Sequence, residues 1–191
     1  MTRGALVDIV VKVGGGLLAF PGHLDAVLAA LADAASTSRV LIVPGGGPFA
    51  DAVRAVDREL TLSDDAAHWM AVLAMDQYAH LLVSRLRSAS LASDAGGIAA
   101  ELDRGRLPVL APSRWLRDAD PLPHSWDVTS DSIAAWVAGE VGARRLVLVK
   151  PPGAGDQAVD PYFHRTLPPQ MASSQVVAAD QIDALRRCLT V

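Results

Sequence analysis

Two apolar segments that each end in three consecutive glycines constrain the fold of this chain more than any other feature. Residues 8–13 stop at glycines 14–16, and residues 40–43 stop at a proline followed by glycines 45–47. Both segments are continuous runs rich in Val and Ile, which is typical of strands buried on both faces of a parallel sheet. Helical sequence follows each glycine segment, so the chain opens with two successive strand–turn–helix units.

Strands and helices alternate through the rest of the chain. Apolar runs predict further strands at residues 108–111, 145–149 and 175–178. Helices are expected at residues 23–35, 48–60, 64–87, 98–103 and from Thr129 or Ser130 to residue 138. Residues 112–128 and 150–169 are expected to be irregular loops. This order predicts a three-layer α/β/α fold in which helices cover both faces of a mostly parallel sheet.

Length and composition narrow the class of protein. With 191 residues we expect one domain spanning residues 1–191. The net charge is −4 and no run of Lys or Arg occurs, which disfavours a nucleic-acid partner. The single cysteine, Cys188, excludes an intramolecular disulfide and fits a reducing compartment. No apolar run is long enough to span a membrane and the N-terminus does not resemble a signal peptide, so we predict a cytoplasmic protein.

The two glycine segments predict an anion-binding site. Parallel strands end at the same edge of a sheet, and open α/β proteins bind their ligands beyond that edge. Glycine lets the backbone approach a ligand closely, and the helix that follows offers unpaired N–H groups. A purely structural turn is the alternative, but such a turn needs only one or two glycines.

The two lysines of the chain are further candidates for this site. Of 17 basic residues, only Lys12 and Lys150 are lysines, and each ends a predicted strand. An ammonium group is a compact, freely rotating charge and is not equivalent to the planar guanidinium of arginine. We therefore expect both lysines to have a chemical role, although their survival by chance in an arginine-rich chain is the alternative.

Residues 14–19 also match the dinucleotide fingerprint G-x-G-x-x-A, which would indicate a nicotinamide-dependent oxidoreductase. That site requires an acidic residue near the end of the second strand, where this chain has Val43, Pro44 and Gly45. A Walker motif is absent too, because no lysine follows a glycine segment. The sequence therefore disfavours an oxidoreductase.

Three segments together resemble the amino acid kinase family. They are the strand ending in Lys12-Val-Gly-Gly-Gly, the segment Val-Pro-Gly-Gly-Gly-Pro-Phe-Ala-Asp at residues 43–51, and the helix start Thr-Ser-Asp-Ser-Ile-Ala-Ala at residues 129–135. The resemblance covers about residues 8–149. Within the family, residues 123–131 are most similar to a short branch that phosphorylates aminomethyl-furanmethanol phosphate in methanofuran-type cofactor biosynthesis.

The resemblance implies an ATP- and Mg²⁺-dependent phosphotransferase that acts on a small anionic metabolite. By this resemblance Lys12 and Lys150 bind the phosphates of ATP, and Asp131 orients the lysines or helps to place magnesium. Further nucleotide contacts would come from Gly14, Gly15, Gly16 and Gly153. The acceptor would be held by Gly45, Gly46 and Gly47.

The remaining acceptor contacts are expected from the loop at residues 112–128 and from the start of the helix that follows it. The candidates are Arg114, Arg117, His124, Asp127, Thr129 and Ser130. Arginine suits bidentate binding of phosphate, and a carboxylate such as Asp127 suits a primary ammonium group. The expected acceptor is thus a phosphate monoester, such as aminomethyl-furanmethanol phosphate, which becomes a diphosphate. Solvated loop residues without a role are the alternative.

Two further expectations concern the C-terminal part and the assembly. After residue 149 the sequence Lys-Pro-Pro-Gly replaces the Asp-Val-Asp-Gly type of nucleotide loop, so the nucleotide lobe, about residues 140–191, is shortened. A non-catalytic ligand-binding or regulatory member of the same fold is therefore the alternative function. Helix 64–87 carries apolar residues on more than one face, which predicts a homodimer or higher homo-oligomer.

Overall fold

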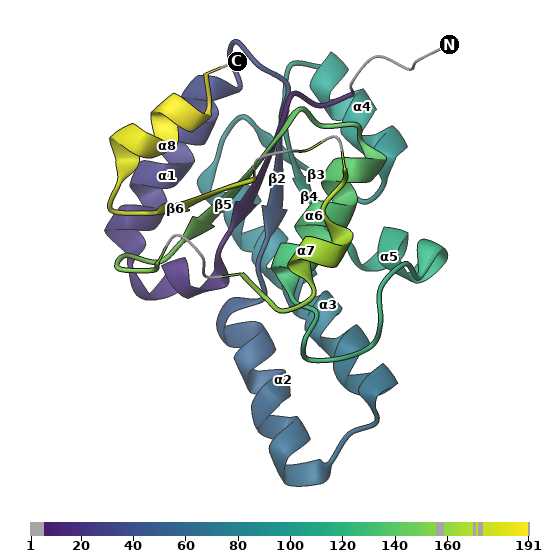
Figure 1. Cartoon of the computed structure of the whole chain (residues 1–191). Coiled ribbons are helices and arrows are strands. Elements are labelled where there is room, and N and C mark those ends of the chain that lie inside the picture. The colour runs from purple at the N-terminus through teal and green to yellow at the C-terminus, as the bar shows by residue number, and fades with distance from the viewer. Residues whose placement is uncertain (1–5, 156–158, 170, 172–173, 191) are drawn as a thin grey trace.

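Strand β1 lies near the centre of a parallel six-stranded sheet. The computed structural model describes residues 6–155, 159–169, 171 and 174–190. Within these residues the strand order is β3-β4-β2-β1-β5-β6, and every neighbouring pair is parallel. The strands are β1 Ile9–Val13, β2 Val40–Pro44, β3 Ala89–Ala92, β4 Leu107–Leu110, β5 Arg145–Lys150 and β6 Ser174–Ala178. Helices lie on both faces, which confirms the predicted three-layer arrangement (Figure 1).

The helices fill the connections between the strands. They are α1 Pro21–Ala34, α2 Gly47–Leu60, α3 Asp64–Arg85, α4 Ala95–Asp103, α5 Ser113–Ala119, α6 Ser130–Glu140, α7 Phe163–Thr166 and α8 Ile182–Cys188, with a 3₁₀ helix, η1, at Gly15–Ala19. In Figure 1, α1 and α8 cover one face of the sheet and α6 and α7 cover the other.

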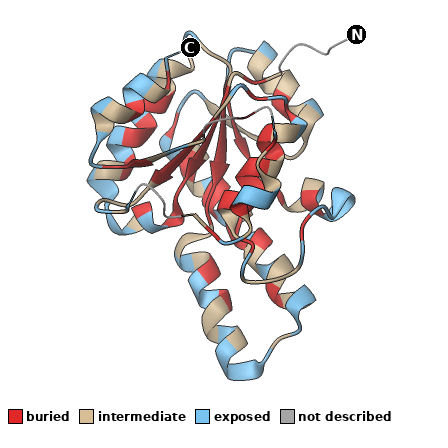
Figure 2. Cartoon of the chain, in the orientation of Figure 1, coloured by how far each residue is buried: buried red, intermediate tan, exposed pale blue. Residues whose placement is uncertain are grey.

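The strands separate two apolar cores, because neighbouring side chains of a strand point to opposite faces. Ile9 and Val11 pack with Leu31 of α1 and Leu185 of α8. Val10 lies on the other face, in the core that contains Ile133 of α6. All residues of β1 and β2 are buried, as the red strands of Figure 2 show. Each such Val or Ile contributes roughly 1.5–3 kcal/mol relative to an exposed side chain.

Helices α2 and α3 pack against each other and extend beyond the carboxyl edge of the sheet (Figure 1). Thr61, in the left-handed conformation, ends α2, and the Asp57 carboxylate accepts a hydrogen bond from the N–H of Leu62. Ser63 then caps α3 by accepting a hydrogen bond from the N–H of Ala66, as its sequence predicts. The pair forms a wall at the edge where ligands bind in such sheets.

The two glycine segments pack against each other, backbone to backbone. A Cβ atom added to Gly15 would lie 2.0 Å from the nitrogen of Gly47, and one added to Gly45 would lie 2.5 Å from the nitrogen of Gly15. Gly47 also has a positive φ of 56°. These contacts leave no room for a side chain. Close packing therefore requires glycine at these positions, whether or not a ligand binds there.

Three elements differ from the sequence-based expectation. Helix α7, Phe163–Thr166, lies within residues 150–169, which were expected to be irregular, and it packs against α6. Residues 112–128 were expected to be irregular, but α5 forms because the Asp76 carboxylate of α3 accepts hydrogen bonds from both the N–H and the hydroxyl of Ser113. Strand β3 was not expected, since Ala89–Ala92 contains no β-branched residue and is only partly buried. Its pairing with β4 defines it. Helix α5 and strand β3 both depend on contacts distant in sequence.

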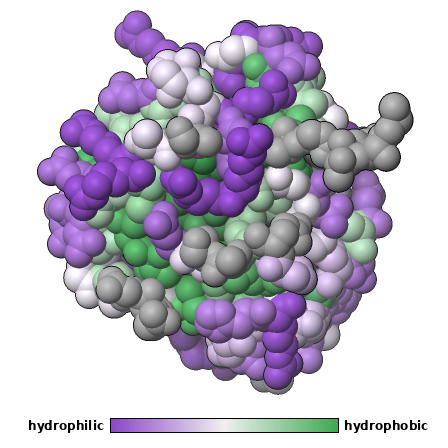
Figure 3. Space-filling model, turned by 45° about the horizontal axis from the view of Figure 1, so that its top comes forward, coloured by the Kyte–Doolittle hydropathy of each residue, from purple (hydrophilic) through white to green (hydrophobic). Residues whose placement is uncertain are grey.

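The surface carries hydrophilic and hydrophobic residues side by side, as Figure 3 shows for one face. Apolar atoms ordinarily make up more than half of a folded protein's surface, so this mixture needs no special explanation. Among the described residues, no helix is long and apolar enough to cross a membrane.

We predict that Gly15→Ala destabilises the protein by more than about 2 kcal/mol, because the new methyl group overlaps the backbone of Gly47. Gly22→Ala is the matched control: it lies in the first turn of α1, and nothing lies within 4 Å of the added Cβ. That variant should gain about 0.4–1 kcal/mol. Urea unfolding measures both, and equal stabilities would contradict the close packing of the two segments.

Candidate active site

A cavity of about 350 Å³ lies at the carboxyl edge of the sheet. Its wall comes from the segments after β1 and β2, from α2 and α3, and from the start of α6. The charged and imidazole side chains that line it are Lys12, Asp51, Arg54, His68, Asp131 and Lys150. Elements far apart in the sequence thus converge on one polar cavity, at the edge where the sequence predicts a ligand site.

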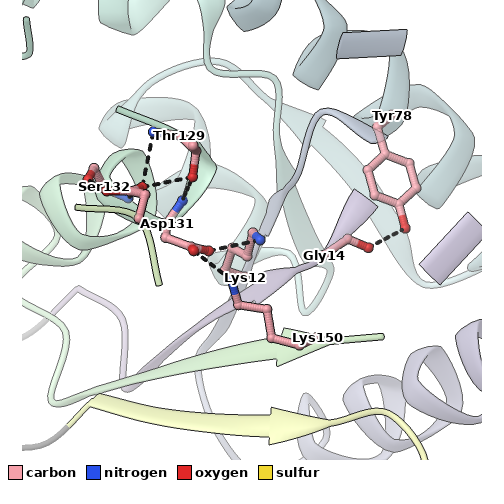
Figure 4. A network of polar contacts seen from close by, with 8 residues as sticks. Lys12, Gly14, Tyr78, Thr129, Asp131, Ser132 and Lys150 are labelled. Carbon is pink, nitrogen blue, oxygen red and sulfur yellow. Dashed lines mark hydrogen bonds and ion pairs between the residues drawn. The ribbon is translucent and has the colours of Figure 1, made fainter. Parts of the chain in front are cut away.

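At one end of the cavity, a single carboxylate joins two lysines from different strands (Figure 4). The Nζ atom of Lys12, in β1, lies 2.9 Å from Oδ1 of Asp131, and Lys150, at the end of β5, donates a hydrogen bond of 2.5 Å to Oδ2. Lys12 is 5% exposed and Asp131 is 3% exposed. Because β1 and β5 are adjacent parallel strands, both lysines reach the same helix start.

Burial opposes the charges of Lys12 and Asp131, and neighbouring charges offset it to a different extent in each case. Burial would raise the pKa of Asp131, but Lys12 and Lys150 outweigh it and lower that pKa, so the carboxylate is ionised. For Lys12, burial together with the positive charge of Lys150 outweighs the attraction of Asp131 and lowers the pKa. Asp131 therefore compensates the charges of buried Lys12 and half-buried Lys150 only in part, and an anionic ligand would add to the compensation.

The glycines divide between packing and lining the cavity. Gly14 donates its N–H to the carbonyl of Val149, and Gly45 donates to the carbonyl of Val13, so both extend the sheet. The Gly14 carbonyl faces the hydroxyl of buried Tyr78 at 3.4 Å (Figure 4). In contrast, Gly15, Gly16, Gly46 and Gly47 line the cavity. These four bring backbone close to any bound ligand.

The opposite end of the cavity contains Asp51 and Arg54, which the sequence analysis did not select. Arg54 on α2 pairs with Asp51 one turn earlier at 2.7 Å, and its guanidinium lies 4.9 Å from the ring centre of Trp126. The indole N–H of Trp126 donates to the Asp57 carboxylate at 2.8 Å. The position of Asp51 and Arg54 in the first turns after Gly47 was a signal for this site, because those turns necessarily lie beside the second glycine segment.

A histidine pair attaches the loop before α6 to α3. The ring nitrogens of His124 lie 2.6 Å from Asp65 and 2.9 Å from Asp120, and its ring stacks on His68 with centres 4.0 Å apart. Burial opposes the charge of His124, but hydrogen bonds to both carboxylates outweigh it and raise its pKa. Burial and the adjacent His124 lower the pKa of His68 to about 4. His68, which lines the cavity, is thus neutral near pH 7.

The remaining candidates from the sequence fall into two groups. Thr129 and Ser130 line the cavity, and Thr129 caps α6 by accepting a hydrogen bond from the N–H of Asp131 at 3.3 Å. The cavity wall formed by the described residues does not include Gly14, Gly45, Arg114, Arg117, His124, Asp127 or Gly153. Arg117 instead lies over the ring of Trp69 at 4.6 Å, and His124 contacts the site only through His68.

A metal site is not formed by the described side chains. No group of three or more His, Cys, Asp or Glu residues among them is arranged to hold a metal ion. Asp131 does not fit as a magnesium ligand either, because both of its oxygens face lysine ammonium groups. We therefore assign no protein ligand to magnesium. What the site offers is positive charge and glycine backbone, which suit phosphate groups.

Comparison with known proteins gives one family and one curated relative. The model of the amino acid kinase family matches residues 9–151. The chain is 29% identical over 145 residues to the [5-(aminomethyl)furan-3-yl]methyl phosphate kinase of Methanocaldococcus jannaschii. The matched part is 73% of this chain and 63% of that relative, so the chain spans less than two thirds of the relative's length.

Solved structures share the fold at low sequence identity. A uridylate kinase from Archaeoglobus fulgidus superposes with a TM-score of 0.72 at 16% identity, covering 95% of both chains. A UMP kinase from Ureaplasma parvum gives a TM-score of 0.67 at 17% identity, again covering 95% of both chains. Likeness at this identity establishes the common fold.

We predict that the His124 contacts make stability fall with rising pH. The folded pKa of His124 lies above its ordinary value of 6.5, so its contribution is complete below pH 6.5 and is lost as the pH rises through the folded pKa. The contribution is about 0.5–1 kcal/mol, since both carboxylates are solvent-exposed. Thermal unfolding of the wild type and His124→Ala should therefore differ most at pH 6.5 and converge at higher pH.

The control for this experiment is His80→Ala, which removes an exposed histidine from the same helix α3. Measurements stay at or above pH 6.5, because protonation of His68 contributes only below that value. A constant difference between wild type and His124→Ala across this range would contradict the assignment.

Proposed function

The chain belongs to the amino acid kinase family, and on this basis we propose that it transfers the γ-phosphoryl group of ATP to a small anionic metabolite. The observation that carries the proposal is the pair of lysines joined by one buried carboxylate beside two glycine segments. Phosphoryl transfer requires in-line positioning and positive charge around the transferred group, and it requires little covalent chemistry from the protein. The cavity brings positive charge and glycine backbone for positioning together at one edge of the sheet.

Each residue of the cluster then has a defined role. Lys12 and Lys150 stabilise the negative charge on the phosphates of ATP as the acceptor oxygen bonds to the γ-phosphorus and the bond to ADP breaks. Asp131 holds the two ammonium groups in place and reduces the electrostatic repulsion between them. The backbone of Gly15 and Gly16 supports the transferred group. A phosphate acceptor is already ionised near neutral pH, so no general base is needed.

For the acceptor we propose a phosphate monoester of a small ring-bearing alcohol, converted to a diphosphate. The support is the similarity to a kinase whose name specifies an aminomethyl-furanyl-methyl phosphate. The far end of the cavity fits such a molecule, since Arg54 suits an anionic group, Trp126 offers a flat surface and Asp51 suits an ammonium group. Asp51 thereby takes the role that the sequence suggested for Asp127.

We also propose that α3 forms a homodimer interface. The face of α3 directed away from the core exposes Met70 and Leu73, which are 37% and 46% exposed. The opposite face of the helix packs into both cores through residues such as Met75 and Tyr78. Apolar residues on the outer face would be covered in a two-fold arrangement of two copies.

The dimer predicts a dimeric mass in sedimentation velocity at micromolar concentration. Leu73→Glu places like charges at the two-fold interface and should shift the protein to monomer. Glu59→Lys on exposed α2 serves as a control for changed surface charge. A monomeric wild type would contradict this part of the proposal and leave the activity untouched.

The activity itself is tested by ADP release with ATP, magnesium and four acceptors. These are aminomethyl-furanmethanol phosphate, uridylate, isopentenyl phosphate and acetylglutamate. We expect preference for the first. Preference for another acceptor would change the substrate assignment and leave the kinase assignment in place. No turnover with any of them, together with no ATP binding, would favour the non-catalytic alternative.

Variants at the two ends of the cavity should separate chemistry from acceptor binding. Lys12→Ala should lower kcat on the order of 100-fold, and Lys12→Arg should not restore it. Arg54→Ala should instead raise the acceptor KM about 10- to 100-fold, because it removes hydrogen bonds to a charged group. Arg58→Ala, exposed one turn further along α2, is the matched control. Unchanged kcat in Lys12→Ala would contradict the mechanism.

A further inference from the structure

A buried carboxylate from the C-terminal part of the chain holds the start of α6. Asp160 follows β5 and is 7% exposed. Its Oδ2 atom accepts hydrogen bonds from the N–H of Thr129 at 3.0 Å, from the hydroxyl of Thr129 at 2.7 Å and from the N–H of Ser132 at 3.0 Å. Its Oδ1 atom accepts from the hydroxyl of Ser132 at 2.5 Å and from the N–H of Tyr162 at 3.0 Å. Four of these five bonds reach the first turn of α6.

These bonds lead to the backbone of Asp131, whose carboxylate lies between the two lysines. Asp131 lies between Thr129 and Ser132 in the sequence, and Asp160 fixes both of them. The Thr129 hydroxyl donates to Asp160 and accepts from the N–H of Asp131, so the three residues form one continuous chain of hydrogen bonds. The orientation of Asp131 toward Lys12 and Lys150 therefore depends on Asp160.

Asp160 also adds negative charge near this cluster. Lys12 and Lys150 present two ammonium groups, whereas Asp131 provides one carboxylate. The groups that act on Lys12 are Asp131 from α6, Lys150 from β5 and Asp160 from the segment after β5. Asp160 attracts Lys12 without contacting it, and it also places a carboxylate at the positive N-terminal end of α6.

We propose that Asp160 is a positioning residue for phosphoryl transfer, which holds Asp131 between Lys12 and Lys150 and ties the segment after β5 to that cluster. The effect on rate rests on the kinase function proposed above. Helix α7, which begins three residues after Asp160, packs against α6, so the two segments form one unit.

A simple helix cap is the competing explanation, and the chain contains a suitable comparison. Asp94 caps α4 by accepting a hydrogen bond from the N–H of Gly97 at 2.7 Å, and it does not line the cavity. Asp94 and Asp160 share the chemistry of a carboxylate at a helix start. They differ in that only Asp160 adjoins the lysine cluster. Asp94→Ala and Asp94→Asn therefore control for the loss of a cap.

The kinetic test compares two substitutions of Asp160 with these controls. Asp160→Ala removes both the cap and the charge, and we expect kcat to fall about 10- to 100-fold with little change in the KM for ATP. Asp160→Asn keeps an oxygen that can cap α6 but removes the charge. It should retain more activity, and the alkaline limb of its kcat profile should move to lower pH. Asp94→Ala should lower the melting temperature while leaving kcat unchanged.

A second measurement does not depend on activity. Because the chain has only two lysines, labelling with ¹³C-lysine gives two side-chain signals in an NMR titration, and Lys12→Arg identifies which is which. Asp160→Asn should lower the titration midpoint of Lys12, whereas Asp94→Asn should leave both midpoints unchanged. An inactive wild type would contradict the kinase function but not this shift.

The proposal is overturned if folded Asp160→Ala keeps kcat within twofold of the wild type. It is also overturned if kcat falls only in proportion to the folded fraction, as a cap alone would require, while Asp160→Asn leaves the midpoint of Lys12 unchanged.

Discussion

The ionised carboxylate of Asp131, buried between two ammonium groups, is the interaction on which the rest of the site depends. A buried charge is costly unless it is paired, and removal of one partner of such a pair commonly destabilises a protein by about 3–5 kcal/mol. Three elements must meet to form this group, namely β1 with Lys12, β5 with Lys150 and the first turn of α6. The adjacent parallel pairing of β1 and β5 is therefore a condition for the chemistry as well as for the core.

The other end of the cavity, where we propose that the acceptor binds, is built differently from this charged end. Near the lysines, the backbones of Gly15 and Gly47 pack so closely that this part of the wall has no room for an added methyl group. At the other end, the wall consists of long side chains held by each other, with Trp126 placed between Arg54 and Asp57. We propose that the charged end binds phosphate groups and that the other end recognises the acceptor through these side chains.

Asp160, in the C-terminal part of the chain, contributes to the site by supporting α6, and it does not line the cavity. Sequence comparison with the family suggested a shortened nucleotide lobe after residue 149, and residues 156–158 lie outside the described part. Asp160 nevertheless anchors the start of α6 with four hydrogen bonds from this region. A segment that looked reduced therefore supports the carboxylate that organises both lysines.

The sequence by itself determined the described strands other than β3, and the charged end of the site. Continuous apolar strands, the glycine segments and the positions of Lys12 and Lys150 are local features, because burial and turn geometry restrict which residues occupy them. Only the tertiary structure decided the other contacts. Helix α5 begins where Ser113 contacts Asp76, the proposed acceptor site forms where Arg54 lies over Trp126, and the start of α6 that carries Asp131 is held by Asp160. The physical reason is that these are hydrogen bonds and ion pairs between polar residues far apart in the sequence, and a polar residue carries no local pattern that reveals its partner.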